Sequence, residues 1–174
     1  MCETKSYVQS SFLLTLLAII ALASHTWAQR PVTVILVRHA EKDYADPNKS
    51  DQRLSAVGHF RADALVSAVE RFGIRRIFST DFARTRDTVG PLSQLKGIPI
   101  TIYDPRDLRG LAEKIKALRK DRRVIVAGHS NTIPPLVNLL IGEELYREFG
   151  EFEYNKIFVV KLGSGKPSVK VLTY

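Results

Sequence analysis

Two histidines in this sequence each follow a short apolar run with the composition of a buried β-strand. His39 follows the run 33–37 (TVILV), with Arg38 between them. His129 closely follows the run 124–127 (VIVA). Continuous β-branched runs of this kind are typical of strands covered on both faces of a parallel sheet. Ligands of such sheets bind beyond the carboxyl ends of the strands, so we expect both imidazoles at one edge.

Arginines and a carboxylate follow two further strand-like runs. Arg84 and Arg86 come after the run 76–79 (RIFS), and Asp104 follows the run 99–103 (PITIY). An arginine presents a planar fork of donors to phosphate oxygens, and a neutral imidazole is a nucleophile toward phosphorus. Zinc would need a further neutral ligand, and the arginines would repel it. The residue types therefore favour phosphoryl transfer with no metal and no cofactor.

The spacing of apolar residues predicts the elements that carry these groups. Strands are predicted at 33–37, 76–79, 99–103, 124–127, 154–162 and 169–174, and helices at 55–72, from Thr80 or Asp81 to about Leu95, at 107–120 and from Thr132. Four successive strand–helix units predict a three-layer α/β/α sandwich with a mostly parallel central sheet. The Gly-rich turn before the last strand predicts an antiparallel C-terminal pair. We expect the second helix to bend or break at Gly90-Pro91.

The N-terminal segment has the pattern of a secretory signal. An apolar run, 12–23, follows Lys5 and precedes a small-residue cleavage site at 26–28 (TWA). We expect a signal peptide at 1–28, one domain at 29–174, and a periplasmic or secreted location. The alternative is an uncleaved anchor, although the run is shorter than the about 20 residues of a membrane span.

The charge balance narrows the class of partner. The chain of 174 residues carries a net charge of +8, which favours anionic partners. Its basic residues form no dense block interleaved with aromatic residues, so we expect no nucleic acid. The single cysteine, Cys2, lies in the predicted signal, which leaves no cysteine-based metal site. The expected partner is a small phosphorylated substrate, without stable membrane insertion after signal cleavage; the sequence does not predict the oligomeric state.

Four segments, in order along the chain, resemble the signatures of the histidine phosphatase superfamily, also called phosphoglycerate mutase-like. They are LVRHAEK (36–42), LSAVG (54–58), STDFARTRDT (79–88) and GHSNT (128–132). The family's usual glycine after the first histidine is replaced here by Ala40. The resemblance covers most of 29–174 and includes the small bacterial phosphohistidine and sugar-phosphate phosphatases. It implies a phosphoglycerate mutase-like fold and a phosphoric monoester hydrolase.

The resemblance also implies a role for each matching residue. His39 would be the nucleophile and would be transiently phosphorylated. Arg38 and Arg84 would bind the phosphoryl oxygens, and His129 would stabilise the charge that develops on them. Arg84 fits better than Arg86 because it has the family's spacing to a later threonine. For attack His39 must be neutral, and we expect an acceptor such as a backbone carbonyl to hold its other ring nitrogen.

The general acid is the open position in this scheme. The acid phosphatase branch places an aspartate after the second histidine, where this chain has Ser130. The mutase-like branch places a carboxylate between the second arginine and the second histidine. Asp104 is the first choice because it directly follows a predicted strand, and Asp107 and Glu41 are alternatives. Without a dedicated acid the enzyme would be restricted to good leaving groups.

The predicted function is metal-independent hydrolysis of phosphate monoesters or phosphoramidates through a phosphohistidine intermediate on His39. The same residues would also serve a non-catalytic, phosphate-recognising binding module or a phosphomutase. The chain has no long insertion that would enclose a mutase intermediate. Export would bring the enzyme to sugar phosphates, lipopolysaccharide phosphates or nutrient phosphoesters.

Overall fold

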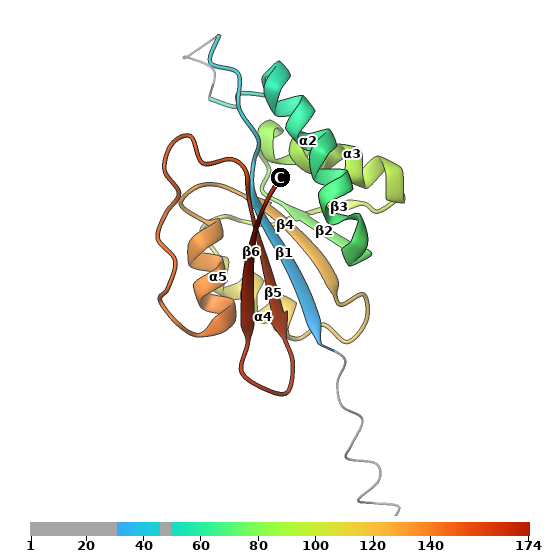
Figure 1. Cartoon of the computed structure of the whole chain (residues 1–174), viewed down its shortest axis with the longest axis vertical. Helices are drawn as coiled ribbons and strands as arrows, with labels where there is room; N and C mark the ends of the chain where they lie inside the picture. The colour runs from blue at the N-terminus through green and yellow to red at the C-terminus, as the bar shows by residue number, and fades with distance from the viewer. Residues whose placement is uncertain (1–30, 46–49) are drawn as a thin grey trace, which may run out of the picture.

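A six-stranded sheet with helices on both faces forms the core of the protein (Figure 1). The computed structural model describes residues 31–45 and 50–174, so the predicted signal 1–28 lies outside the described residues. The strands are β1 (Val32–Arg38), β2 (Arg76–Ser79), β3 (Ile100–Ile102), β4 (Arg123–Gly128), β5 (Lys156–Leu162) and β6 (Ser168–Thr173). The helices are α2 (Ala56–Val69), α3 (Ala83–Lys96), α4 (Leu108–Lys116) and α5 (Ile133–Ile141), with a 3-10 turn, η1 (Glu70–Phe72), after α2.

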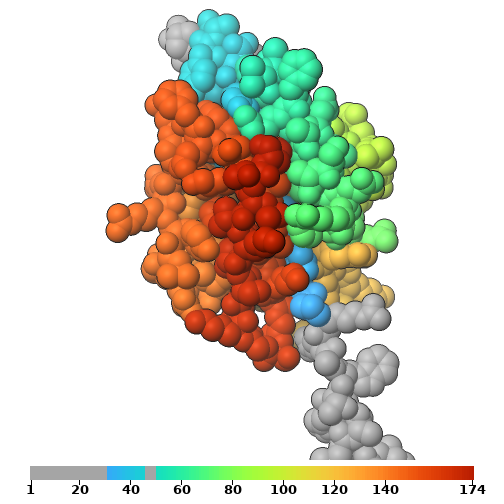
Figure 2. Space-filling view, viewed as in Figure 1, coloured from blue at the N-terminus to red at the C-terminus, as the bar shows by residue number. Residues whose placement is uncertain are grey.

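The strand order is β3-β2-β4-β1-β5-β6. The first four strands in this order are parallel neighbours, and β5 is antiparallel to both β1 and β6. This confirms the predicted sandwich with a mostly parallel sheet and an antiparallel C-terminal hairpin. β6 forms one edge of the sheet, and most of its residues are exposed (Figure 2).

The two faces of the sheet are covered by different helix pairs. Alternate residues of β1 point to opposite faces, as expected for a strand. Ile35 and Val37 pack in the cluster that contains residues of α2 and α3, whereas Val34 and Leu36 pack with residues of α4 and α5. All four side chains are fully buried, and each contributes about 1.5–3 kcal/mol by leaving water. Burial on both faces explains why the run that precedes the first histidine is continuously apolar.

The first helix follows its sequence signals closely. The hydroxyl of Ser55 accepts a hydrogen bond from the Gly58 amide at 3.1 Å and caps α2. The helix then tightens into η1, and Gly73 ends it with a left-handed φ of 55°. The predicted helix at 55–72 with its glycine stop is confirmed.

The start of α3 differs from the prediction. Its N-cap is Phe82, not Thr80 or Asp81. The hydroxyl of Thr80 contacts Thr85 and His129 instead of capping the helix. The carboxylate of Asp81 is bound to Arg86. The hydroxyl of Thr80 is thus engaged by a residue distant in sequence, and the carboxylate of Asp81 by an arginine of α3.

The expected break at Gly90-Pro91 is also absent, because α3 runs without interruption to Lys96. Pro91 cannot donate the helical hydrogen bond at its position. Val89 and Leu92, on either side, are buried against the sheet and hold both halves of the helix in place.

The start of α4 has the predicted cap, but its end differs from the prediction. Asp107 caps α4 by accepting from the Gly110 amide at 2.8 Å, but the helix ends at Lys116, four residues before the predicted end. The chain then turns through Asp121, whose φ is 51°. No helix within residues 31–45 and 50–174 has the length and apolar character needed to span a membrane.

Candidate active site

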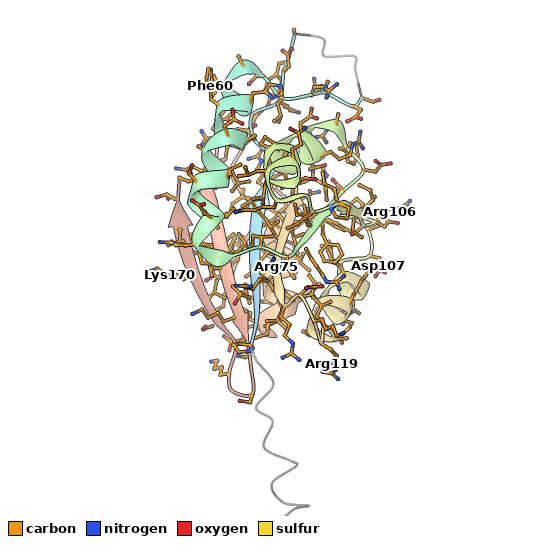
Figure 3. The ribbon with its side chains drawn as sticks, turned by 90° about the vertical axis from the view of Figure 1, so that its right-hand side faces the viewer. Phe60, Arg75, Arg106, Asp107, Arg119 and Lys170 are labelled. Atoms are coloured by element: carbon orange, nitrogen blue, oxygen red, sulfur yellow. The ribbon has the colours of Figure 1, made fainter. Side chains whose placement is uncertain are left out.

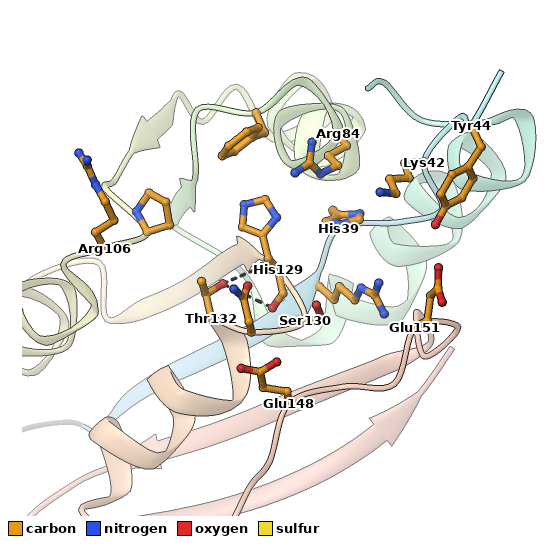
Figure 4. Close-up of a pocket in the computed structure, with 14 residues that line it drawn as sticks. His39, Lys42, Tyr44, Arg84, Arg106, His129, Ser130, Thr132, Glu148 and Glu151 are labelled. Atoms are coloured by element: carbon orange, nitrogen blue, oxygen red, sulfur yellow. Dashed lines mark hydrogen bonds between the residues drawn. The ribbon is translucent and has the colours of Figure 1, made fainter. Parts of the chain in front are cut away.

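Pairing of β1 with β4 brings the two histidines together. The parallel register places Arg38 opposite Gly128, and the His39 amide donates to the Gly128 carbonyl oxygen at 2.8 Å. His39 and His129 therefore leave the sheet from adjacent strands. Their ring centroids are 5.5 Å apart, and both rings line the same cavity (Figure 4). The structure thus joins the two imidazoles that the sequence placed at one edge.

Hydrogen bonding fixes the tautomer of His39. Nδ1 lies 2.7 Å from the carbonyl oxygen of Ala40, so this nitrogen carries the hydrogen and Nε2 keeps its lone pair. The residue is buried, with 5% of its surface exposed. Burial is the main cause that lowers the pKa of His39 to about 3, against the hydrogen bond to Ala40, which opposes this shift. The positive charges of Arg84 and Arg38 lower this pKa further, so His39 is a neutral imidazole near pH 7.

His129 is held on the neighbouring loop. Its amide donates to the hydroxyl of Thr132 at 2.8 Å, and Thr132 is the N-cap residue of α5 without a side-chain capping hydrogen bond. Its ring meets the edge of Phe82, with centroids 5.0 Å apart. Burial, followed by the charges of Arg84 and Arg38, lowers the pKa of His129 to about 4. Both imidazoles are therefore neutral near pH 7.

Arg38 connects the first histidine to the segment between α5 and β5, residues 142–155, here termed the linker. Nη1 of Arg38 donates to the carbonyl oxygens of Gly150 at 2.8 Å and Glu153 at 3.3 Å. The guanidinium carbon lies 4.1 Å from the ring centroid of Tyr154. Its Nε is buried and has no hydrogen-bond partner among the described residues. A buried, unsatisfied donor is costly unless an anion accepts from it.

Arg84 reaches the same cavity from α3. Its guanidinium carbon lies 4.5 Å from the ring centroid of Phe82, and its Nε is likewise buried without a partner in the described chain. Thr88 fixes this helix to the nucleophile loop, since its hydroxyl accepts from the Ala40 amide at 2.9 Å and donates to the Arg84 carbonyl oxygen at 2.7 Å. Arg86, by contrast, pairs with an aspartate outside the cavity.

The cavity has a volume of about 580 Å³, enough for a small phosphorylated molecule. Fourteen residues line it: Arg38, His39, Lys42, Tyr44, Phe82, Arg84, Pro105, Arg106, His129, Ser130, Asn131, Thr132, Glu148 and Glu151 (Figure 4). Four of them are arginines or lysines, which gives the cavity a field that attracts anions. Within the described ranges, no group of three histidine, cysteine or acidic side chains is arranged to hold a metal ion.

A close contact of α2 shapes the loop after the nucleophile. The Ser55 amide donates to the carbonyl oxygen of Glu41 at 2.9 Å. A Cβ atom at Gly58 would lie only 2.1 Å from the same oxygen, so any larger residue would force the helix away. The LSAVG segment therefore positions the backbone that follows His39.

Asp104 is not placed as the sequence predicted. Its carboxylate accepts from Arg106 through three contacts of 2.8–3.2 Å and does not line the cavity. Hydrogen bonds from Arg106 hold the pKa of Asp104 at about 2, so it carries no proton near pH 7. The prediction that Asp104 faces the site is wrong. Arg106 binds the Asp104 carboxylate, and it is Arg106 that lines the cavity.

The two alternative carboxylates are also engaged elsewhere. Asp107 caps α4 and lies at the edge of the molecule together with Arg106 (Figure 3). Glu41 forms a bidentate pair with Arg61 at 2.6–2.8 Å. Burial raises the pKa of Glu41, but the hydrogen bonds and charge of Arg61 outweigh it and hold this pKa below its usual range. Neither carboxylate lines the cavity.

The carboxylates that do line the cavity, Glu148 and Glu151, come from the linker (Figure 4). The linker is fixed at two points near them. The Phe149 amide donates to the Ser130 carbonyl oxygen at 3.2 Å, and the Gly150 carbonyl accepts from Arg38. Neither glutamate was predicted from the sequence as a site residue. The available signal was the acidic composition of a segment that enters β5, the strand beside β1.

Comparison with known proteins agrees with this geometry. The model of the histidine phosphatase superfamily (branch 1) matches residues 34–106, which include Arg38, His39 and Arg84. A sequence search of curated proteins finds no match.

Solved structures share the fold over nearly their full lengths. One from Agrobacterium tumefaciens, assigned as the phosphohistidine phosphatase SixA, has 23% identity and a TM-score of 0.65, covering 82% of this chain and 98% of its own. The protein histidine phosphatase SixA complexed with tungstate has 19% identity and a TM-score of 0.62, covering 81% and 96%. A mycobacterial glucosyl-3-phosphoglycerate phosphatase has 17% identity and a TM-score of 0.59, covering 83% and 99%. Residues 34–106 therefore match the histidine phosphatase superfamily, and the chain shares its fold with these solved structures.

Proposed function

We propose that this protein is a metal-independent phosphatase that hydrolyses phosphate monoesters or phosphoramidates through a phosphohistidine intermediate on His39. The observation that carries the proposal is a buried, neutral imidazole in the same cavity as two guanidiniums, each with a buried Nε that has no acceptor among the described residues. His39 presents the lone pair of Nε2, while Nε of Arg38 and Nε of Arg84 are buried without acceptors in the described chain. The activities named for the solved relatives, on phosphohistidine and on a sugar phosphate, support the same class of reaction.

In the first step, Nε2 of His39 attacks phosphorus and the bond to the leaving group breaks. Arg38 and Arg84 bind the phosphoryl oxygens, and His129 stabilises the charge that develops on them. Because the carbonyl of Ala40 accepts from Nδ1, it also stabilises the positive charge on the ring during attack. Water then attacks phospho-His39 and releases inorganic phosphate.

We propose that Glu151 is the general acid that donates a proton to the leaving group. This residue follows Gly150, whose carbonyl is held by Arg38, so its backbone is fixed beside the phosphoryl site. Glu148 instead flanks the contact with Ser130 on the second-histidine side. A carboxyl at Glu151 would protonate the leaving oxygen, and the resulting carboxylate would take a proton from the attacking water.

The substrate and location follow from the predicted signal at 1–28. We propose that it is cleaved after Ala28, and that the domain at 29–174 acts outside the cytoplasm on a small phosphoester such as a sugar phosphate. The pattern of apolar run and small-residue site supports this. N-terminal sequencing of exported protein should begin at Gln29; a retained Met1 in the mature protein would contradict it.

The activity is tested by hydrolysis of p-nitrophenyl phosphate in the presence of a chelator. We expect turnover by the wild type and a fall to the background rate in His39→Ala. Loss of activity when chelator is added would refute the metal-free mechanism. Equal inertness of both proteins toward several phosphates, with retained binding of phosphate, would favour a non-catalytic binding module.

A further inference from the structure

A chain of two buried threonine hydroxyls contacts the ring of His129. Nε2 of His129 lies 3.0 Å from Oγ1 of Thr80, which lies 2.8 Å from Oγ1 of Thr85. Both threonines are fully buried. Oγ1 of Thr85 also lies 2.8 Å from the carbonyl oxygen of Phe82 and 3.0 Å from that of Thr80.

Counting hydrogens fixes the direction of this chain. Each hydroxyl has one hydrogen to donate. The hydrogen of Thr85 goes to a carbonyl oxygen, because carbonyls only accept and two of them contact this hydroxyl. Thr85 can then only accept from Thr80, which uses the single hydrogen of Thr80. Thr80 has none left for the imidazole, so Nε2 of His129 is the donor in their contact.

We propose that Thr80 and Thr85 fix His129 as its Nε2–H tautomer, so that Nδ1 faces the phosphoryl group and must gain a proton before it can donate to it. The bound phosphoryl group in this statement rests on the proposed function, whereas the tautomer in the free protein does not. The proton comes from solvent or from a monoanionic phosphate, and no covalent bond changes. Thr80 and Thr85 act through the ring and are positioning residues.

The charges around the ring couple this proton to anion binding. The charged or titratable groups that share the cavity with His129 come from β1 and the loop after it, α3, the turn before α4, and the linker: Arg38, His39, Lys42, Tyr44, Arg84, Arg106, Glu148 and Glu151. In the free site, burial and the two arginines nearest the ring lower the pKa of His129 to about 4 and keep it neutral. A dianion bound between those arginines offsets their charge and favours the imidazolium. Anion and proton therefore bind cooperatively, each raising the affinity for the other.

The direct test is ¹⁵N NMR of the histidine rings, with the signals of His129 assigned by their loss in His129→Gln. In the free protein near pH 7, we expect a protonated Nε2 and an unprotonated Nδ1. Tungstate, a tetrahedral oxyanion that remains dianionic near neutral pH, serves as the probe. In its complex we expect both nitrogens of His129 to be protonated. An Nδ1–H tautomer in the free protein, or a neutral His129 in the complex, would overturn the proposal.

Variants of Thr80 separate the hydroxyl from its packing. Thr80→Val keeps the side-chain shape but removes the acceptor, so the Nδ1–H tautomer becomes available and can donate to tungstate without proton uptake. In the wild type, proton uptake should add a loss of about tenfold in tungstate affinity for each unit of rising pH. This additional loss should be absent in Thr80→Val. Thr80→Ser should restore both the tautomer and the steepness. Equal steepness in all three proteins would refute the coupling.

These readouts are independent of turnover. If the protein does not hydrolyse phosphates but His129 shows the expected tautomer, the proposed function is refuted and this inference still holds. If Thr80→Val does not fold, as judged by circular dichroism, the wild-type spectra decide the matter alone.

Discussion

Acidification should destabilise this protein through the buried, neutral ring of His39. Its pKa is about 3 in the folded chain, against about 6.5 in an unfolded one. Between about pH 6.5 and pH 3, this imidazole therefore binds a proton in the unfolded chain but not in the folded chain. The contribution to stability is fully present above about pH 6.5 and is lost as the pH falls toward 3. The slope is about 1.4 kcal/mol per pH unit, so between about pH 7.5 and pH 5 the loss is about 2 kcal/mol.

The variant His39→Asn removes this titration, because an asparagine binds no proton in either state. We expect its free energy of unfolding to fall less than that of the wild type over the same pH interval, by about 2 kcal/mol. Urea denaturation followed by circular dichroism at both pH values measures the difference. His59→Asn, which removes an exposed imidazole from α2, is the matched control and should behave as the wild type. An equal loss in His39→Asn and the wild type would refute the claim that this imidazole is held neutral.

Three further predictions follow from the site. Arg84→Gln should weaken tungstate binding by about 10- to 100-fold, because it removes charged hydrogen bonds worth about 1.5–3 kcal/mol, whereas Arg86→Gln should change it little; titration calorimetry compares them. Glu151→Gln should slow hydrolysis of an alkyl phosphate by about 100-fold or more while sparing p-nitrophenyl phosphate, and Asp104→Asn should leave both rates unchanged. Equal effects of Glu151→Gln on the two esters would show that Glu151 is not the general acid. Gly58→Ala should lower the midpoint of thermal unfolding, at a cost of about 1–3 kcal/mol, since its Cβ would lie 2.1 Å from a backbone oxygen; an unchanged midpoint would contradict the contact.

Much of the fold was predictable because the sheet is buried on both faces. The apolar runs of β1 and β4 reveal parallel strands, and a parallel register necessarily brings the residues after them to one edge. That geometric rule brought Arg38, His39 and His129 together with the arginines that follow β2, and the resemblance to the histidine phosphatase superfamily favoured Arg84 over Arg86. Helix starts were less predictable, since Thr80 contacts His129 and Asp81 pairs with Arg86 instead of capping α3.

The carboxylates could not be predicted because their partners are set in three dimensions. Asp104 directly follows a strand, yet Arg106 binds it outside the cavity. Glu41 lies two residues from the nucleophile, yet Arg61 of α2 binds it. Glu151 belongs to a linker without periodicity, and its place depends on the hydrogen bond that the Arg38 guanidinium donates to the Gly150 carbonyl oxygen. Local sequence indicates which residues reach an edge of the sheet but not which side chains neutralise one another there.

The central claim is that the phosphoryl group passes through His39. Mixing the wild-type protein with ³²P-labelled substrate and quenching in alkali should trap a phosphoenzyme that is stable in base and lost in acid, as phosphohistidine is. Peptide mapping should place the label on His39, and His39→Asn should carry none. Turnover with no labelled protein, or a label that persists in His39→Asn, would contradict the account.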